Sequence, residues 1–270
     1  GDLSSFSSQK MSELDEGVIA RLLQSGEIIT LATGKSEVGA RALGHRSLIA
    51  APNLGYIKDK LNHSVKKRED FRPYGACVLE DRVEDFFQCP PNYQSPYMDR
   101  AVKIKPEFQH YLKDIVHLDS TTRIQTVKRD TSSLSRILQG MEKLTGIPIV
   151  INTSLNRMGE PICESIGEVE DLIIEEKLRY AVIQDKLHEF TPSQEYHLMN
   201  LDYEFELYAD EIPAPKKGRV DLEYLYFFYP HDSNEFLKPK LEYPKQYLER
   251  LKTLNIKPQT SDENDARNWY

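Results

Sequence analysis

The sequence contains few cysteines and no long apolar run. Its 270 residues include three cysteines, Cys77, Cys89 and Cys163, with no CxxC pair, and the odd number leaves at least one thiol unpaired. We therefore expect reduced thiols without a metal or redox role. No apolar run approaches the roughly 20 residues of a membrane helix, and residues 1–10 lack the basic and apolar regions of a secretory signal. These absences predict a cytoplasmic protein that does not associate with membranes.

Two familiar site patterns are also missing. Residues 34–36 (GKS) resemble part of a nucleotide P-loop, but that motif requires a glycine where this chain has Ile29. No Ser-His-Asp arrangement is evident. His117 and Asp119 provide fewer ligands than a zinc site requires, so we expect them to form hydrogen bonds or to orient Arg123. We expect no metal site within this chain.

Charge is distributed unevenly along a chain that is acidic as a whole. The formal net charge of −8 disfavours nonspecific binding to DNA. Between Lys35 and Arg72, however, nine basic residues stand against four acidic ones. A basic segment within an acidic chain indicates a bounded site for an anionic ligand.

The spacing of apolar residues predicts alternating helices and strands. We expect helices over residues 12–26 and 132–146, and a third that starts at Ser165, where Glu168 completes a capping box. Strands are expected over residues 27–33, 147–151 and 180–184. This alternation is typical of a mixed α/β sheet that carries its ligand groups at strand ends.

The composition changes after about residue 190. The last 80 residues hold nine of the 15 tyrosines, and 15 acidic against ten basic residues. We therefore divide the chain into a domain at residues 1–190 and an acidic, Tyr-rich C-terminal extension at residues 191–270. The extension is too aromatic for plain disorder, so we expect it to pack on the domain or on a partner.

Four segments combine basic residues with glycines and small polar residues. They are residues 34–47 (GKSEVGARALGHRS), 62–73 (NHSVKKREDFRP), 117–125 (HLDSTTRIQ) and 152–156 (NTSLN). Arginine can pair two phosphate oxygens at once and lysine adds a compact charge. Together the segments predict one pocket for a phosphate-rich ligand. The alternatives are a solvated basic turn, an exposed charged helix face and a locally capped turn.

Spacing restricts how two of these segments can reach one ligand. Lys66 and Arg72 are not two full helical turns apart, so a helix cannot aim both at the same point. We expect this helix to end near residue 70, with Arg72 extended because a proline follows it. Asn152, Ser154 and Asn156 alternate along an expected strand and can face one side.

Taken jointly and in this order, the four motifs resemble the C-terminal domain of the O-carbamoyltransferase family, which includes nodulation-factor and antibiotic carbamoyltransferases. The resemblance covers about residues 12–187. It implies a YrdC-like fold, a twisted mixed sheet with flanking helices and a cationic cavity. It also implies ATP, Mg²⁺ and carbamoyl phosphate as ligands. Carbamate released from carbamoyl phosphate would attack the α-phosphate of ATP to give carbamoyl adenylate and pyrophosphate.

The resemblance further implies a partner and a set of site residues. In the family, a separate actin-like (HSP70-fold) domain with bound iron or another metal passes the carbamoyl group to an acceptor hydroxyl, and no segment of this sequence corresponds to it. The acceptor would be a small molecule or, less readily, a hydroxymethylated DNA base. By position, the catalytic residues would be Arg41, Lys66, Arg72 and Arg123. The residues that bind nucleotide or carbamoyl phosphate would be Arg41, Arg46, Lys66, Arg68, Arg72, Arg123, Asn152, Ser154 and Asn156.

Two positions depart from the family pattern, and two other functions stay open. The family often has Asn at the position of His45 and an aromatic residue at the position of Val38; neither change removes a charge. The open alternatives are a non-catalytic nucleotide-binding subunit whose aromatic tail docks a partner, and a YrdC-like nucleic-acid-binding module that uses the basic segment.

Overall fold

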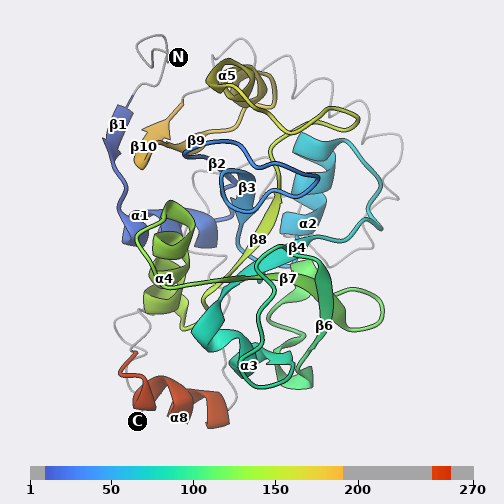
Figure 1. Ribbon diagram of the computed structural model, residues 1–270, viewed down its shortest axis with the longest axis vertical. Coiled ribbons are helices and arrows are strands. Elements are labelled where there is room, and N and C mark those ends of the chain that lie inside the picture. Colours follow the sequence, from blue (N-terminus) through green and yellow to red (C-terminus); the bar gives the residue numbers. More distant parts are fainter. Residues whose placement is uncertain (1–9, 191–244, 257–270) are drawn as a thin grey trace, which may run out of the picture. The chain divides into compact units, whose positions relative to one another are not determined.

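A ten-stranded mixed sheet forms the centre of the computed structural model, which describes residues 10–190 and 245–256 (Figure 1). The strand order is β1-β10-β9-β2-β3-β8-β4-β7-β6-β5. The strands are β1 (Lys10–Glu13), β2 (Ile29–Ala32), β3 (Arg46–Ala50), β4 (Gly75–Leu79), β5 (Phe87–Gln88), β6 (Arg100–Ile104), β7 (Thr121–Val127), β8 (Ile149–Ser154), β9 (Tyr180–Ile183) and β10 (Lys186–Glu189).

Strand β8 occupies the middle of this sheet, antiparallel to β3 on one side and to β4 on the other. The pairs β2–β9 and β4–β7 are parallel, whereas the other adjacent strands run antiparallel. The predicted mixed α/β sheet with flanking helices is confirmed.

Helices of very different length flank the sheet. They are α1 (Glu16–Gln24), α2 (Ile57–Lys60), α3 (Val83–Phe86), α4 (Ser133–Thr145), α5 (Ile166–Glu175) and α8 (Lys245–Thr253), with a π-helix η2 (Leu61–Lys66) and the 3-10 helices η3 (Glu80–Arg82), η4 (Pro106–Phe108) and η5 (Lys113–Ile115). The capping box of Ser165 and Glu168 at the start of α5 is confirmed. Helix α4 ends at Gly146, whose φ of 74° is left-handed and favours glycine.

Each face of the sheet has its own apolar core. On one face, α1 and α4 pack side by side (Figure 1) over strand residues such as Val150. On the opposite face, α2, η2 and α5 cover residues such as Ile149 and Ile151. A side chain at Gly140 would collide with the backbone of Glu16, so the close approach of α4 to α1 requires glycine there. Because side chains alternate between the two faces along β8, Asn152 lies on the same α1–α4 face as Val150.

Two expected helix limits are wrong. The first helix begins at Glu16, with Asp15 as its N-cap, because residues 10–13 pair with β10 instead. The helix through the second basic segment ends at Lys66 and not near residue 70. The backbone N–H groups of Lys67 and Arg68 both bond to one carbonyl, that of Asn62, and Lys67 turns left-handed (φ 45°). A left-handed residue cannot continue a right-handed helix.

Helix α8 contributes to the same core as the sheet. Leu251 is 1% exposed and belongs to the same apolar core as Ile149 and Ile151, and Arg250 bonds to Asp85 of α3 at 3.3 Å. The rest of the predicted extension lies outside the described residues, so the division at residue 190 stays a prediction.

None of the described helices is both long enough and apolar enough to cross a membrane.

Candidate functional site

Three of the four predicted segments meet at the carboxyl end of β8. Asn152 on β8 lies opposite Ile49 of β3 and Gly75 of β4. Its amide nitrogen donates to the carbonyl of Ala42 and to Oε1 of Gln125, both at 3.0 Å. These two bonds join β8 to the loop at residues 33–45 and to β7. Side chains of β8 and β7 therefore hold this loop above the α1–α4 face of the sheet.

Lys66 brings in the fourth segment from the end of η2. Its ammonium group bonds to the carbonyls of Ser154 and Asn156 and to the side-chain Oδ1 of Asn156, the last at 2.8 Å. Lys66 is 4% exposed, and within the described ranges no carboxylate forms an ion pair with it. Burial, reinforced by the charge of Arg68, lowers the pKa of Lys66 to about 7. A cation buried among neutral oxygens would be stabilised by an anion.

Ser154 and Asn156 complete a polar ring around this ammonium group. The hydroxyl of Ser154 donates to Oδ1 of Asn156 at 2.6 Å, and the amide nitrogen of Asn156 donates to the carbonyl of Glu160 at 2.7 Å. Asn156 lies beyond the end of β8, in a bend, and not on the strand as expected. The bend lets two carbonyls and one amide converge on Lys66.

Arg41 and Arg68 both lie within electrostatic range of Arg123. Burial lowers the pKa of Arg123 on β7, and the charges of Arg41 and Arg68 lower it further. Arg68 is held by Asn62, whose Oδ1 accepts from Nε at 2.9 Å, and by the ring of Tyr74, 4.6 Å below its guanidinium carbon. Between residues 10 and 190 and in α8, no carboxylate forms an ion pair with any of the three. Like charges without counterions indicate an anion site.

Unpartnered polar atoms point to the same place. Four buried side-chain atoms of the described residues lack a hydrogen-bond partner, and three belong to the site segments: Oε2 of Glu37, Nδ2 of Asn62 and Oδ1 of Asn152. The fourth is the hydroxyl of Thr30 on β2. Buried polar atoms without partners are costly. Their concentration here is consistent with a ligand or water that completes the hydrogen bonds.

Sequence reasoning missed the residues that hold the loop in place. Oε1 of Glu37 accepts from the backbone N–H groups of Leu43 and His45, both at 2.7 Å, and of Arg46 at 3.2 Å. The side chain of Gln125 donates to the carbonyl of Leu43 at 2.9 Å. The sequence feature that could have identified them is the presence of an acid, Glu37, and an amide, Gln125, within segments otherwise rich in basic residues.

Arg46 holds the loop rather than lining an open space. The side chain is 4% exposed, and its Nε, Nη1 and Nη2 donate to backbone carbonyls. The acceptors belong to Thr33, Gly34, His45 and Glu164. The predicted ligand contact of Arg46 stays a prediction, and it would require some of these bonds to open.

Arg72 stands apart from the cluster. Its Nε bonds to Glu69 at 2.8 Å, and its side chain is 48% exposed. No interaction found among the described residues joins it to Lys66 or to the three arginines. The predicted contact of Arg72 with the triphosphate stays a prediction.

The candidates for metal or redox chemistry have ordinary structural contacts. A ring nitrogen of His117 lies 3.3 Å from the carbonyl of Tyr74, and Asp119 accepts from the N–H of Thr121 at 3.0 Å. No group of three or more His, Cys, Asp or Glu residues suited to a metal ion occurs in the described ranges. The three cysteines are free, and burial raises the pKa of Cys77 to about 12.

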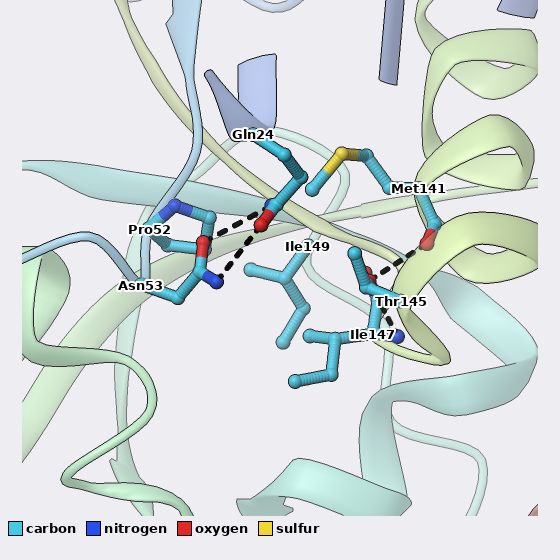
Figure 2. Close-up of a pocket in the computed structure, with 7 residues that line it drawn as sticks. All are labelled: Gln24, Pro52, Asn53, Met141, Thr145, Ile147 and Ile149. Carbon is cyan, nitrogen blue, oxygen red and sulfur yellow. Dashed lines mark hydrogen bonds between the residues drawn. The ribbon is translucent and has the colours of Figure 1, made fainter. Parts of the chain in front are cut away.

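A separate small pocket contains none of the predicted site residues. Its lining consists of Gln24, Pro52, Asn53, Met141, Thr145, Ile147 and Ile149 (Figure 2). The amides of Gln24 and Asn53 bond to each other at 3.1 Å, and the hydroxyl of Thr145 donates to the carbonyl of Met141 at 2.7 Å. Because these polar groups already satisfy one another, we assign no ligand to this pocket.

Comparison with known proteins places the chain in a family. Residues 20–189 match the family described as carbamoyltransferase C-terminus. Nodulation protein NolNO of Sinorhizobium fredii is 38% identical over 151 residues, covering 55% of this chain and 22% of the relative. Nodulation protein U of Rhizobium tropici is 40% identical over 142 residues, covering 52% and 24%. The chain therefore spans about a quarter of the length of these relatives.

Two solved structures resemble part of this chain at low sequence identity. Full-length HypF in its phosphate- and nucleotide-bound form has a TM-score of 0.44 at 16% identity, covering 66% of this chain and 22% of that one. Sua5 of P. abyssi complexed with L-threonine has a TM-score of 0.43 at 12% identity, covering 59% and 45%. Because the family match extends over most of the described sheet and its helices, the chain belongs to the family of carbamoyltransferase C-terminal domains.

Proposed function

We propose that this domain forms carbamoyl adenylate for an O-carbamoyltransferase. In the proposed reaction, hydrolysis of carbamoyl phosphate gives carbamate and inorganic phosphate. A carbamate oxygen then attacks the α-phosphate of ATP, the bond to the β-phosphate breaks, and pyrophosphate leaves. Nucleotide and carbamoyl phosphate would bind at the cluster of Arg41, Lys66, Arg68 and Arg123.

The observation that carries the proposal is the set of guanidinium groups that lack carboxylate partners. Burial disfavours the charged form of Arg123, and the charges of Arg41 and Arg68 disfavour it further. A bound triphosphate or phosphate dianion would remove that electrostatic cost and would accept hydrogen bonds from the guanidinium N–H groups. Lys66 supplies a fourth positive charge next to them.

The chemistry requires positive charge more than it requires a general base. Carbamate and ATP are both anions, so fixed cations that bring them together lower the barrier by orientation and by stabilising charge in the transition state. Bound Mg²⁺ would be carried by the phosphates and would neutralise charge on pyrophosphate as it leaves. The side chain of Asn152 could then orient the nucleotide through its unpartnered Oδ1.

Transfer to an acceptor would need another part of the protein. We propose that an actin-like metal-binding domain or subunit, in the remaining length of the relatives, receives carbamoyl adenylate and passes the carbamoyl group to an acceptor hydroxyl. A small molecule is the expected acceptor, and a hydroxymethylated DNA base is the less favoured alternative. Iron or another metal would belong to that partner.

Arg123→Met provides a direct test of the proposed function. The chain would be incubated with carbamoyl phosphate, ATP and Mg²⁺, with and without the candidate partner, and pyrophosphate would be measured together with ATP affinity. Loss of one charge-assisted phosphate contact should weaken ATP binding about 10- to 100-fold. The variant should fold at least as well as wild type, because a repelling charge has been removed.

The matched control is Arg129→Met, since Arg129 is paired with Asp81 and Glu142. ATP affinity should not change in this variant. Unaltered affinity in Arg123→Met would refute the assignment of the site. Tight ATP binding without pyrophosphate, even with the partner present, would favour a non-catalytic nucleotide-binding subunit instead.

A further inference from the structure

Beside the anion site, the adjacent residues Lys66 and Lys67 are linked to the adjacent residues Asn156 and Arg157 in two places. Within the site, Lys66 bonds to Asn156 through its ammonium group. The next residues along the chain, Lys67 and Arg157, both bond to a third side chain, that of Glu176. Glu176 directly follows α5, so a helix distant in sequence connects the two segments that hold the buried lysine.

Glu176 is placed to act as a rigid bridge. Its side chain is 2% exposed; its two carboxylate oxygens lie 3.1 and 3.0 Å from Nζ of Lys67, and Oε1 also accepts from Nε of Arg157 at 2.9 Å. A buried carboxylate without cations would be costly, so both bonds are strongly favoured. The backbone of Glu176 is also fixed, because its N–H bonds to the carbonyl of Leu172.

The backbone at Lys67 indicates that the side chain is needed there. Lys67 is left-handed, with φ 45° and ψ 53°, a conformation that favours glycine. A lysine at this position accepts backbone strain that a glycine would avoid. Its contact with Glu176 gives a physical reason for the lysine, since glycine would leave the buried carboxylate with one cation fewer.

We propose that Glu176 is a positioning residue that holds Lys66 against Asn156 by fixing their neighbours Lys67 and Arg157. The proposal deepens the proposed function, because it concerns the lysine assigned to the phosphate site. Without Glu176, the end of η2 and the bend after β8 would move independently, and the ring of oxygens around Lys66 would open to water. Glu176 itself would not touch the ligand.

The first test compares Glu176→Gln with Glu175→Gln. Glu175 also bonds to Arg157, but its side chain is 62% exposed and it has no described contact with Lys67. We expect Glu176→Gln to weaken binding of Mg·ATP about tenfold, and Glu175→Gln to change it less than twofold. Equal affinities in the two variants would overturn the proposal.

A second variant separates positioning from stability. Lys67→Gly relieves the left-handed strain but also removes a cation from the buried carboxylate of Glu176, so the two effects on the melting temperature oppose each other and its net change should be small, while affinity for Mg·ATP falls about fivefold. Glu176→Gln in the Lys67→Gly background should cause little further loss, because the bridge is already broken. Unchanged affinity in Lys67→Gly, or additive losses in the double variant, would contradict a bridge.

A readout on Lys66 tests the bridge without any nucleotide. The pH dependence of Lys66 labelling by an amine reagent, followed by mass spectrometry, reports how strongly the amine is desolvated. The midpoint should rise in Glu176→Gln and should stay at the wild-type value in Glu175→Gln. If wild type binds no ATP but the midpoint rises as expected, the proposed function fails and the bridge stands; an unmoved midpoint defeats the bridge.

Discussion

Arg123 and Arg129 lie near opposite ends of β7, yet their surroundings differ in kind. Burial and the charges of Arg41 and Arg68 lower the pKa of Arg123. Burial would also lower the pKa of Arg129, but hydrogen bonds to Asp81 and Glu142 outweigh it and raise the pKa. One arginine is stabilised by the fold, whereas the other carries a cost that the described residues do not offset.

A similar contrast separates two deeply buried cations, Arg82 and Lys66. Arg82 is 1% exposed and is paired with Asp85 and Glu142. Lys66 is 4% exposed and is surrounded by neutral oxygens. We propose that cations paired with carboxylates stabilise this fold, as Arg46 does through backbone carbonyls, whereas Lys66 and Arg123 mark the place where a ligand would supply negative charge.

Breaking the paired cluster should have the largest effect on stability. Among the described residues, Arg82→Met leaves the buried carboxylate of Glu142 with Arg129 alone, and the partly buried carboxylate of Asp85 with Arg250 alone. Loss of one member of a buried ion pair costs about 3–5 kcal/mol, so the free energy of unfolding should fall by that order in urea denaturation. Affinity for Mg·ATP in the folded variant should stay within twofold of wild type.

A loss of affinity in Arg82→Met comparable to that in Arg123→Met would contradict the contrast. Leu251→Met is a suitable control, because it changes a residue buried in the apolar core without touching an ion pair. It should cost less than about 1.5 kcal/mol, as apolar substitutions of similar volume do.

The second-largest expected effect is the contribution of Lys66 to the pH dependence of the free energy of unfolding. Burial lowers its pKa from 10.5 to about 7 in the folded state. Between these values the unfolded chain binds more protons than the folded chain, so this group makes stability increase with pH and gives no slope below pH 7. From pH 7 to pH 9 the gain should be about 2–3 kcal/mol.

Lys66→Met isolates that contribution from the other groups that titrate in this range. The difference in free energy of unfolding between wild type and Lys66→Met should increase in favour of wild type as pH rises from 7 to 9. In saturating Mg·ATP this difference in free energy should vary less with pH, because a bound anion keeps Lys66 charged. A difference that is constant with pH would show that Lys66 titrates normally.

Much of the fold could be predicted because its signals are local. The capping box at Ser165 and Glu168 and the strand expected at residues 147–151, observed at Ile149–Ser154, depend on neighbouring residues. Pairing in space is not local: Arg82 and Glu142 are 60 residues apart in the sequence. The sequence therefore shows where arginines lie but not which of them have carboxylate partners.

The candidate site was predictable to a similar degree. The motifs predicted that Lys66, Ser154 and Asn156 would face one pocket, but not that the ammonium group of Lys66 would bond directly to Ser154 and Asn156. The backbone carbonyls that engage Arg46 could not be seen, because every residue carries a carbonyl and no side-chain pattern marks the ones that face inward. Gln125 was missed for a related reason: its function depends on the register between β4 and β7, which pairs it with Cys77.

Substitution of Arg72 should have the smallest effect on stability and on ATP affinity. It tests whether pairing with a carboxylate is enough to exclude a cation from the ligand site. Arg72 is paired like Arg129, but the pair with Glu69 is exposed, and exposed pairs contribute little to stability. Arg72→Ala should leave the melting temperature within about 1 °C of wild type. ATP affinity, measured by calorimetry, should fall about two- to threefold through the loss of one screened positive charge near the site. A tenfold loss would instead mean that Arg72 leaves Glu69 and binds the phosphates directly, so that pairing in the free protein would not be enough to exclude a cation from the site.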